Sequence, residues 1–115
     1  MHKPISPTLH GMIDYTTSVA VAAAPSVLDF PEPAAELCYA LAGSYTGMSM
    51  LTDYPPAAKR MIPFKAHGVV ESVIGMALPV LPWALGFSKH RAARNFCIGL
   101  AAFTFVVAAY TDWEE

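Results

Sequence analysis

Two histidines, each followed four residues later by a carboxylic acid, are the residues of this chain best suited to chemistry. The pairs are His10 with Asp14 and His67 with Glu71. This spacing places each histidine and its acid on the same face of a helix, one turn apart. Imidazole and carboxylate groups together suit iron, manganese or zinc. One hypothesis is therefore a metal or proton site that contains all four residues.

A structural role for these residues is the alternative that we favour, so we expect no metal and no catalytic residue. Acids in a first helical turn are stabilised by the helix macrodipole. Asp53 and Asp112 are expected at helix C-termini, where an anion needs a compensating partner. Each histidine would then connect its helix start to an acid at a neighbouring helix end, and its loss would cost about 1–2 kcal/mol. A metal would instead require ligands that converge to about 2.0–2.2 Å from one point.

The histidine pairs belong to a longer internal repeat. Residues 10–30 align with residues 67–87, and residues 38–54 align with residues 97–113. We therefore expect a single domain over residues 1–115, made of repeat 1 at about 5–54 and repeat 2 at about 62–113. Because residues 10–30 have an internal counterpart, we interpret them as a retained helix and not as a signal peptide.

The composition predicts a membrane protein. Hydrophobic residues make up 55% of the chain and charged residues only 14%, with a mean hydropathy of +0.41. A soluble domain carries about 25% charged residues, so this chain has too few to cover a surface that faces water. The net charge is −2 and the basic residues are scattered, so we expect no nucleic-acid partner.

Four apolar segments predict four helices, and prolines mark several of their ends. The expected helices cover residues 8–28, 34–53, 64–86 and 92–111. Each is about 20 residues long, or roughly 30 Å, which is the thickness of a bilayer core. The predicted fold is an all-α integral membrane four-helix bundle, made of two tandem, like-oriented transmembrane hairpins.

Like-oriented hairpins place both termini on the same side of the membrane. That side holds Lys3, Lys59, Arg60 and Lys65, and the opposite side holds Lys89, Arg91 and Arg94. Four basic residues against three favour a cytoplasmic location for the termini.

Structural roles are expected for two prolines and one tryptophan near the hairpin turns. Pro25 and Pro82 occupy equivalent positions in the two repeats, and Trp83 follows the second. Proline favours a kink, and tryptophan is enriched where a membrane meets water. We expect the Pro82–Trp83 corner to set a kink and an interfacial anchor.

The paired hairpins resemble the SPW-repeat family of small bacterial membrane proteins. The resemblance rests on the histidine–glycine starts, the proline–tryptophan corner, the Gly86–Phe87 turn and the threonine–aspartate–aromatic ends. The signature tripeptide departs in both copies, which read Ala24-Pro25-Ser26 and Leu81-Pro82-Trp83. The resemblance implies a four-span inner-membrane fold and brings no established activity.

We therefore expect a non-enzymatic multi-pass protein of the bacterial inner membrane that has no cofactor. Its expected partners are the lipid bilayer and either a larger membrane-protein complex, as a scaffold or accessory subunit, or further copies of itself. The alternative is a metal- or quinone-linked redox protein that uses His10, Asp14, His67 and Glu71. A small transporter is a third hypothesis, which the absence of acids and bases in the middle of the spans disfavours.

Overall fold

The structure is a computed structural model that describes residues 3–52 and 58–113. This part of the chain forms helices and no named strand, so the predicted all-α class is confirmed. The helices are α1 (Pro7–Val27), α2 (Glu32–Leu51), α3 (Phe64–Ala77), α4 (Leu81–Ala84) and α5 (Arg91–Tyr110).

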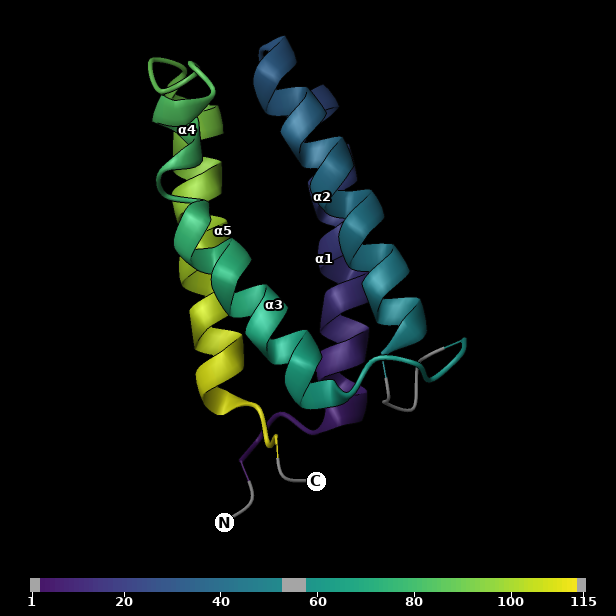
Figure 1. Ribbon diagram of the computed structural model, residues 1–115. Helices are drawn as coiled ribbons and strands as arrows, with labels where there is room; N and C mark the ends of the chain where they lie inside the picture. The colour runs from purple at the N-terminus through teal and green to yellow at the C-terminus, as the bar shows by residue number, and fades with distance from the viewer. Residues whose placement is uncertain (1–2, 53–57, 114–115) are drawn as a thin grey trace.

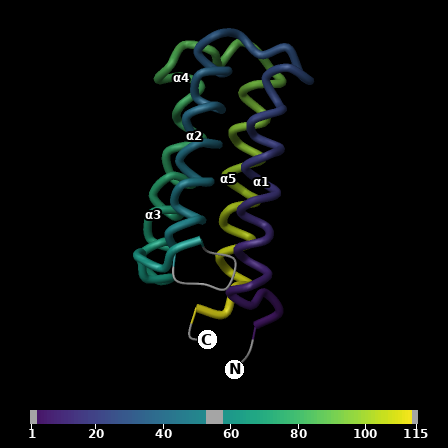
Figure 2. The backbone as a smooth tube through the Cα atoms, turned by 90° about the vertical axis from the view of Figure 1, so that its right-hand side faces the viewer, coloured from purple at the N-terminus to yellow at the C-terminus, as the bar shows by residue number. Residues whose placement is uncertain are grey.

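The helices form two hairpins that run in the same direction. Helices α1 and α2 pack against each other, and α3 and α4 pack against α5. In Figure 1 both hairpins start at the lower end, turn at the upper end and return. Figure 2, turned by 90°, shows the same arrangement in a bundle of about 42 × 26 × 20 Å.

Equivalent residues end the helix that precedes the turn of each hairpin, which is α1 in the first hairpin and α4 in the second. The backbone N–H of Phe30 donates to the carbonyl of Pro25 at 3.1 Å, and that of Phe87 donates to Pro82 at 2.8 Å. The residue before each phenylalanine has a positive φ, 54° at Asp29 and 82° at Gly86. A left-handed residue of this kind is a common helix terminator. The two prolines therefore mark the same cap in both repeats.

The continuous helix that we expected over residues 64–86 is wrong, because α3 ends at Ala77 and α4 starts at Leu81. Pro79 and Pro82 lack backbone N–H groups, and a proline ring also clashes with the carbonyl four residues earlier. The first repeat has Pro25 but carries Ala22 at the position equivalent to Pro79. One proline is tolerated near the end of α1, whereas two interrupt the second repeat.

Large apolar side chains lie on the outside of the bundle, while many polar ones lie inside. The exposed apolar side chains include Val19, Val27, Val69, Val73, Met76, Val80 and Val106. The buried polar or charged side chains include His10, Asp14, Ser18, Ser49, Thr52, His67, Glu71 and Thr111. Apolar side chains such as Val21, Leu78 and Phe87 are buried as well. The bundle therefore differs from a water-soluble one in its apolar outside and in its buried ionisable residues.

By length and hydropathy, one helix of the described residues qualifies as a candidate membrane span. It is α5, with a mean hydropathy of 1.6. The other three expected spans remain predictions. Helix α3 has only 14 residues, and polar residues lower the average hydropathy of α1 and α2, among them the buried Asp14 and the exposed Glu32 and Glu36.

Candidate functional site

The two histidines and their acids converge at one point between the hairpins. His67 Nε2 lies 2.9 Å from Asp14 Oδ2 and 2.9 Å from Glu71 Oε1. His10 Nε2 lies 3.1 Å from Glu71 Oε2 and 3.3 Å from Asp14 Oδ2. One donor atom from each residue lies within 4.8 Å of all the others. Each histidine therefore contacts both acids, one from its own helix and one from the other repeat.

Helices α1 and α3 place this polar cluster inside the protein. His10 and His67 have no exposed surface, and Asp14 and Glu71 are 7% and 5% exposed. Both acids lie seven residues after the first residue of their helix, or roughly 10 Å along its axis. At this depth a charge needs a partner of opposite sign or a neutralising ion.

A threonine holds the far side of each imidazole ring. His10 Nδ1 lies 2.9 Å from Thr111 Oγ1, and His67 Nδ1 lies 2.7 Å from Thr52 Oγ1. Thr111 Oγ1 also donates to the carbonyl of Val107 at 2.5 Å, and Thr52 Oγ1 donates to that of Met48 at 2.6 Å. Because each hydroxyl proton is already used, each threonine oxygen must accept from the imidazole. The Nδ1 atoms therefore carry protons, and the Nε2 atoms face the acids.

The same threonines join the repeats through the backbone. Ile5 pairs with Thr111, and Thr52 pairs with Ile62, in two isolated parallel bridges. Ile5 and Ile62 occupy equivalent positions, as do Thr52 and Thr111. The start of each repeat is thus paired with the end of the other repeat, and the polar cluster lies beside these two bridges.

Two aromatic rings cover the cluster. They lie on its side nearest the end of the bundle where both repeats start. The His10 ring lies 5.4 Å from the ring of Phe64 and 5.2 Å from that of Trp113, centre to centre. Phe64 and Trp113 contact each other at 4.6 Å, and Trp113 Nε1 donates to the carbonyl of Ala108 at 2.9 Å. We call Phe64 and Trp113 the aromatic cover.

Gly68→Ala is expected to disturb this cover and to destabilise the fold by about 1–3 kcal/mol, as overpacking does. A Cβ atom at Gly68 would lie 2.7 Å from the Trp113 ring, which its hydrogen bond and its packing hold in place. Gly99→Ala is the matched control, because a Cβ atom there meets nothing within 4 Å. Tryptophan fluorescence during unfolding checks both variants. Equal stability of the two would show that Trp113 does not pack as described.

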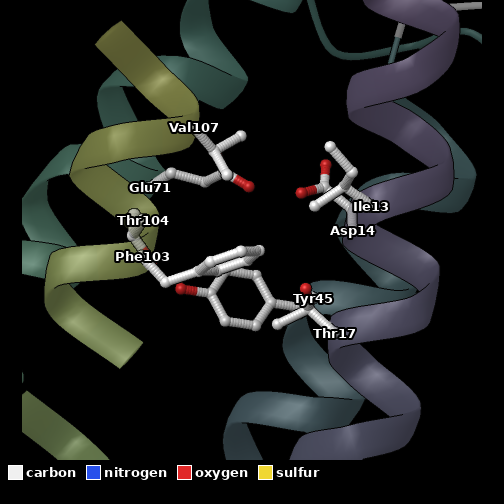
Figure 3. A pocket seen from close by; sticks show the side chains of 8 residues that line it. All are labelled: Ile13, Asp14, Thr17, Tyr45, Glu71, Phe103, Thr104 and Val107. Carbon is white, nitrogen blue, oxygen red and sulfur yellow. The ribbon is translucent and has the colours of Figure 1, made fainter. Parts of the chain in front are cut away.

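A small cavity of about 20 Å³ lies beside the acids. Figure 3 shows the carboxylates of Asp14 and Glu71 pointing toward each other across it, with the rings of Tyr45 and Phe103 next to them. The Tyr45 hydroxyl is buried. A space of this size admits about one water molecule, but no organic substrate.

The structure brings together the four residues that the sequence singled out and adds partners that the sequence analysis missed. The Nδ1 atoms of the two histidines contact Thr111 and Thr52. Each threonine directly precedes the aspartate that we had expected as the partner. Asp112 is buried, with its backbone N–H on the carbonyl of Ile5 at 2.7 Å. Asp53 lies outside the described residues. The equivalent positions of the two threonines in the repeats were the sequence feature that could have identified them as histidine partners.

The other residues with expected structural roles lie near the hairpin turns. Pro25 and Pro82 are buried, and Trp83 is 59% exposed. An exposed tryptophan at the end of a helix is the arrangement expected of an interfacial anchor.

The fold and the cluster define a class of protein. It is an all-helical tandem repeat in which the start of each hairpin pairs with the end of the other, beside a buried polar cluster. The SPW repeat domain matches residues 8–111, and the chain belongs to this family. Membership of the family indicates a small membrane protein. No curated protein and no solved structure matches the sequence.

Proposed function

We propose that this chain is a non-enzymatic, four-span protein of the bacterial inner membrane that acts as a scaffold or accessory subunit of a larger assembly. The observation that carries the proposal is a groove on the outside of the first hairpin. It has a volume of about 520 Å³, and its lining includes Gly43, Gly47, Ala22 and Ala42. Small residues of this kind let a second helix approach closely in a membrane.

The glycines of this groove do not pack closely against another described part of the chain. Gly43 and Gly47 form a G-x-x-x-G motif on α2, and a Cβ atom at either would meet nothing within 4 Å. Their surface is therefore open to a helix from a partner subunit or from a second copy of this chain. Both outcomes agree with an accessory role.

The direction in which the buried polar residues face supports the proposal of four spans. Helices α1 and α2 have 21 and 20 residues, or roughly 30 Å each. Asp14, Ser18 and Ser49 are buried and would not contact lipid. Ionisable groups of membrane proteins face the bundle interior in the same way. The exposed Glu32 and Glu36 lie in the first turns of α2, at the end of the expected span. We place the termini in the cytoplasm, on the side with four of the seven basic residues.

Co-purification from native membranes tests the accessory role. The tagged chain is expected to retain a partner subunit or a second copy of itself in mild detergent. Gly43→Leu with Gly47→Leu should abolish that association, because two large side chains would fill the groove. Gly99→Leu on α5 is the control and should retain it. Recovery of the unmodified chain as a monomer would contradict the proposal.

A redox protein is the second candidate function, and the convergence of two histidines and two acids favours it. The adjoining cavity of about 20 Å³ is too small for a quinone ring. For the cluster itself, the redox candidate is therefore a bound metal ion and not a quinone in this cavity.

A further inference from the structure

We propose that His10, Asp14, His67 and Glu71 bind one divalent first-row transition metal ion between the two repeats. The site would be enclosed within the protein, and each repeat would supply one nitrogen and one oxygen ligand. This proposal goes beyond the scaffold role, because it assigns a ligand to the interior of the bundle and does not depend on a partner.

The spacing of the donor atoms fits an ion at their centre. In a four-coordinate site with bonds of 2.0–2.2 Å, neighbouring donors lie about 3.3–3.6 Å apart. The four histidine–acid distances are 2.9, 2.9, 3.1 and 3.3 Å, and the two that involve Glu71 are to its two different oxygens. One donor atom per residue gives a set within 4.8 Å. Binding an ion would lengthen the short histidine–acid distances by a few tenths of an ångström and bring the most widely spaced donors closer together.

The threonines orient the imidazoles as a metal site requires. Because Thr52 and Thr111 accept from the Nδ1 atoms, the neutral rings direct the Nε2 lone pairs toward the acids. A metal-bound histidine commonly donates its other ring N–H to an oxygen that fixes the ring in this way. Lone pairs that face carboxylate oxygens at 2.9–3.3 Å need positive charge between them.

The net charge of the site can be balanced in two ways. Two protons, one on each Nε2, would neutralise two carboxylates and form ion pairs only. One divalent cation between two neutral imidazoles would neutralise the same two carboxylates. Each Nε2 atom lies near both acids. A single central cation would contact all four residues at once, which is the arrangement that these crossed distances outline.

The donor set also limits which metal can bind. Two imidazole nitrogens and two carboxylate oxygens suit zinc, iron or manganese. Calcium and magnesium prefer oxygen ligands alone. The cavity beside Asp14 and Glu71 has room for about one water molecule, which could serve as a further ligand.

The test uses the full chain, purified in detergent, stripped with a chelator and then titrated with Zn²⁺. We expect one zinc ion per chain by elemental analysis after gel filtration. Cobalt(II) in place of zinc should produce visible absorption bands typical of a low-symmetry nitrogen–oxygen site. Binding of less than about one ion in ten folded chains would overturn the proposal and leave the ion-pair arrangement.

Variants separate binding by the cluster from adventitious binding. His67→Gln keeps a hydrogen-bonding side chain but removes a ligand, so it should fold and lose stoichiometric zinc. Thr52→Val should retain one zinc ion with affinity weakened about 10–100-fold, as for other outer partners of metal ligands. His90→Ala changes a histidine that caps α5 outside the cluster, and it should bind as the unmodified chain does. Stoichiometric zinc in folded His67→Gln would contradict the assignment.

The same variants keep this proposal separate from the scaffold role. If His67→Gln loses zinc but keeps its partner, the metal site stands and is independent of assembly. If the unmodified chain binds no zinc but co-purifies with a partner, the metal proposal fails and the scaffold role stands.

Discussion

His67→Ala is expected to destabilise the folded chain by about 3–5 kcal/mol, the range for removing one partner of a buried ion pair. His67 lies 2.9 Å from both Asp14 and Glu71. Its loss leaves two buried acids with one imidazole between them. This expectation exceeds the 1–2 kcal/mol predicted from sequence, because the contacts lie inside the bundle and each histidine serves both acids. Unfolding in mixed micelles of increasing denaturing detergent measures the difference.

Two further variants test the cause of this loss. His10→Ala should cost less than His67→Ala, because its distances to the acids are longer, 3.1 and 3.3 Å. Adding Asp14→Asn to His67→Ala should recover part of the stability, since one buried charge is removed with its partner. A loss below about 1 kcal/mol for His67→Ala, or no recovery in the double variant, would show that these contacts do not hold the repeats together.

Val19→Lys is expected to cost about 2.5–3.5 kcal/mol of membrane insertion, the value for lysine at the centre of a span. Val19 is 70% exposed, lies near the middle of α1 and borders the groove of the first hairpin, so its side chain would meet lipid or an apolar partner helix. On a water-facing surface the same change would stay within about 0.5 kcal/mol. The partition of the chain between inserted and non-inserted forms measures this effect.

Leu28→Lys is the matched control for the lysine variant. Leu28 is also exposed, at 44%, but it caps the end of α1, where a lysine can reach water. We expect near-normal insertion for Leu28→Lys. Equal insertion of the two variants would mean that the outside of α1 does not lie in the apolar interior of a membrane.

The sequence predicted the helices and the four central residues because both signals are local. Apolar segments between prolines define the hairpins, and a spacing of four places each histidine with its acid. The internal repeat then made it reasonable to expect the pair at His10 and the pair at His67 in equivalent places. Whether the two pairs meet depends on packing between α1 and α3, and no spacing along the chain contains that information.

Two features could not be read from the sequence for different physical reasons. The break between Ala77 and Leu81 comes from two prolines acting together, and the first repeat, with Pro25 alone, suggested a milder kink. The partners of the histidines were missed because a buried imidazole was expected to need a charge. A threonine hydroxyl that already donates to its own helix can accept just as well, as Thr52 does.

The most direct measurement of the central claim, that two like-oriented hairpins cross the membrane, is the labelling of single cysteines in intact cells. Cys38 and Cys97 are buried and would first be replaced by alanine. Single cysteines would then replace Glu32, Lys89 and Arg60, all of which are exposed. Glu32 and Lys89 lie at the two hairpin turns, and Arg60 lies between α2 and α3.

We predict that a membrane-impermeant maleimide labels Glu32→Cys and Lys89→Cys from outside the inner membrane, and labels Arg60→Cys only after lysis. Labelling of Arg60→Cys alone would reverse the orientation but keep the fold. Labelling of Glu32→Cys and Lys89→Cys from opposite sides, or of all three positions from one side, would contradict two like-oriented hairpins across the membrane.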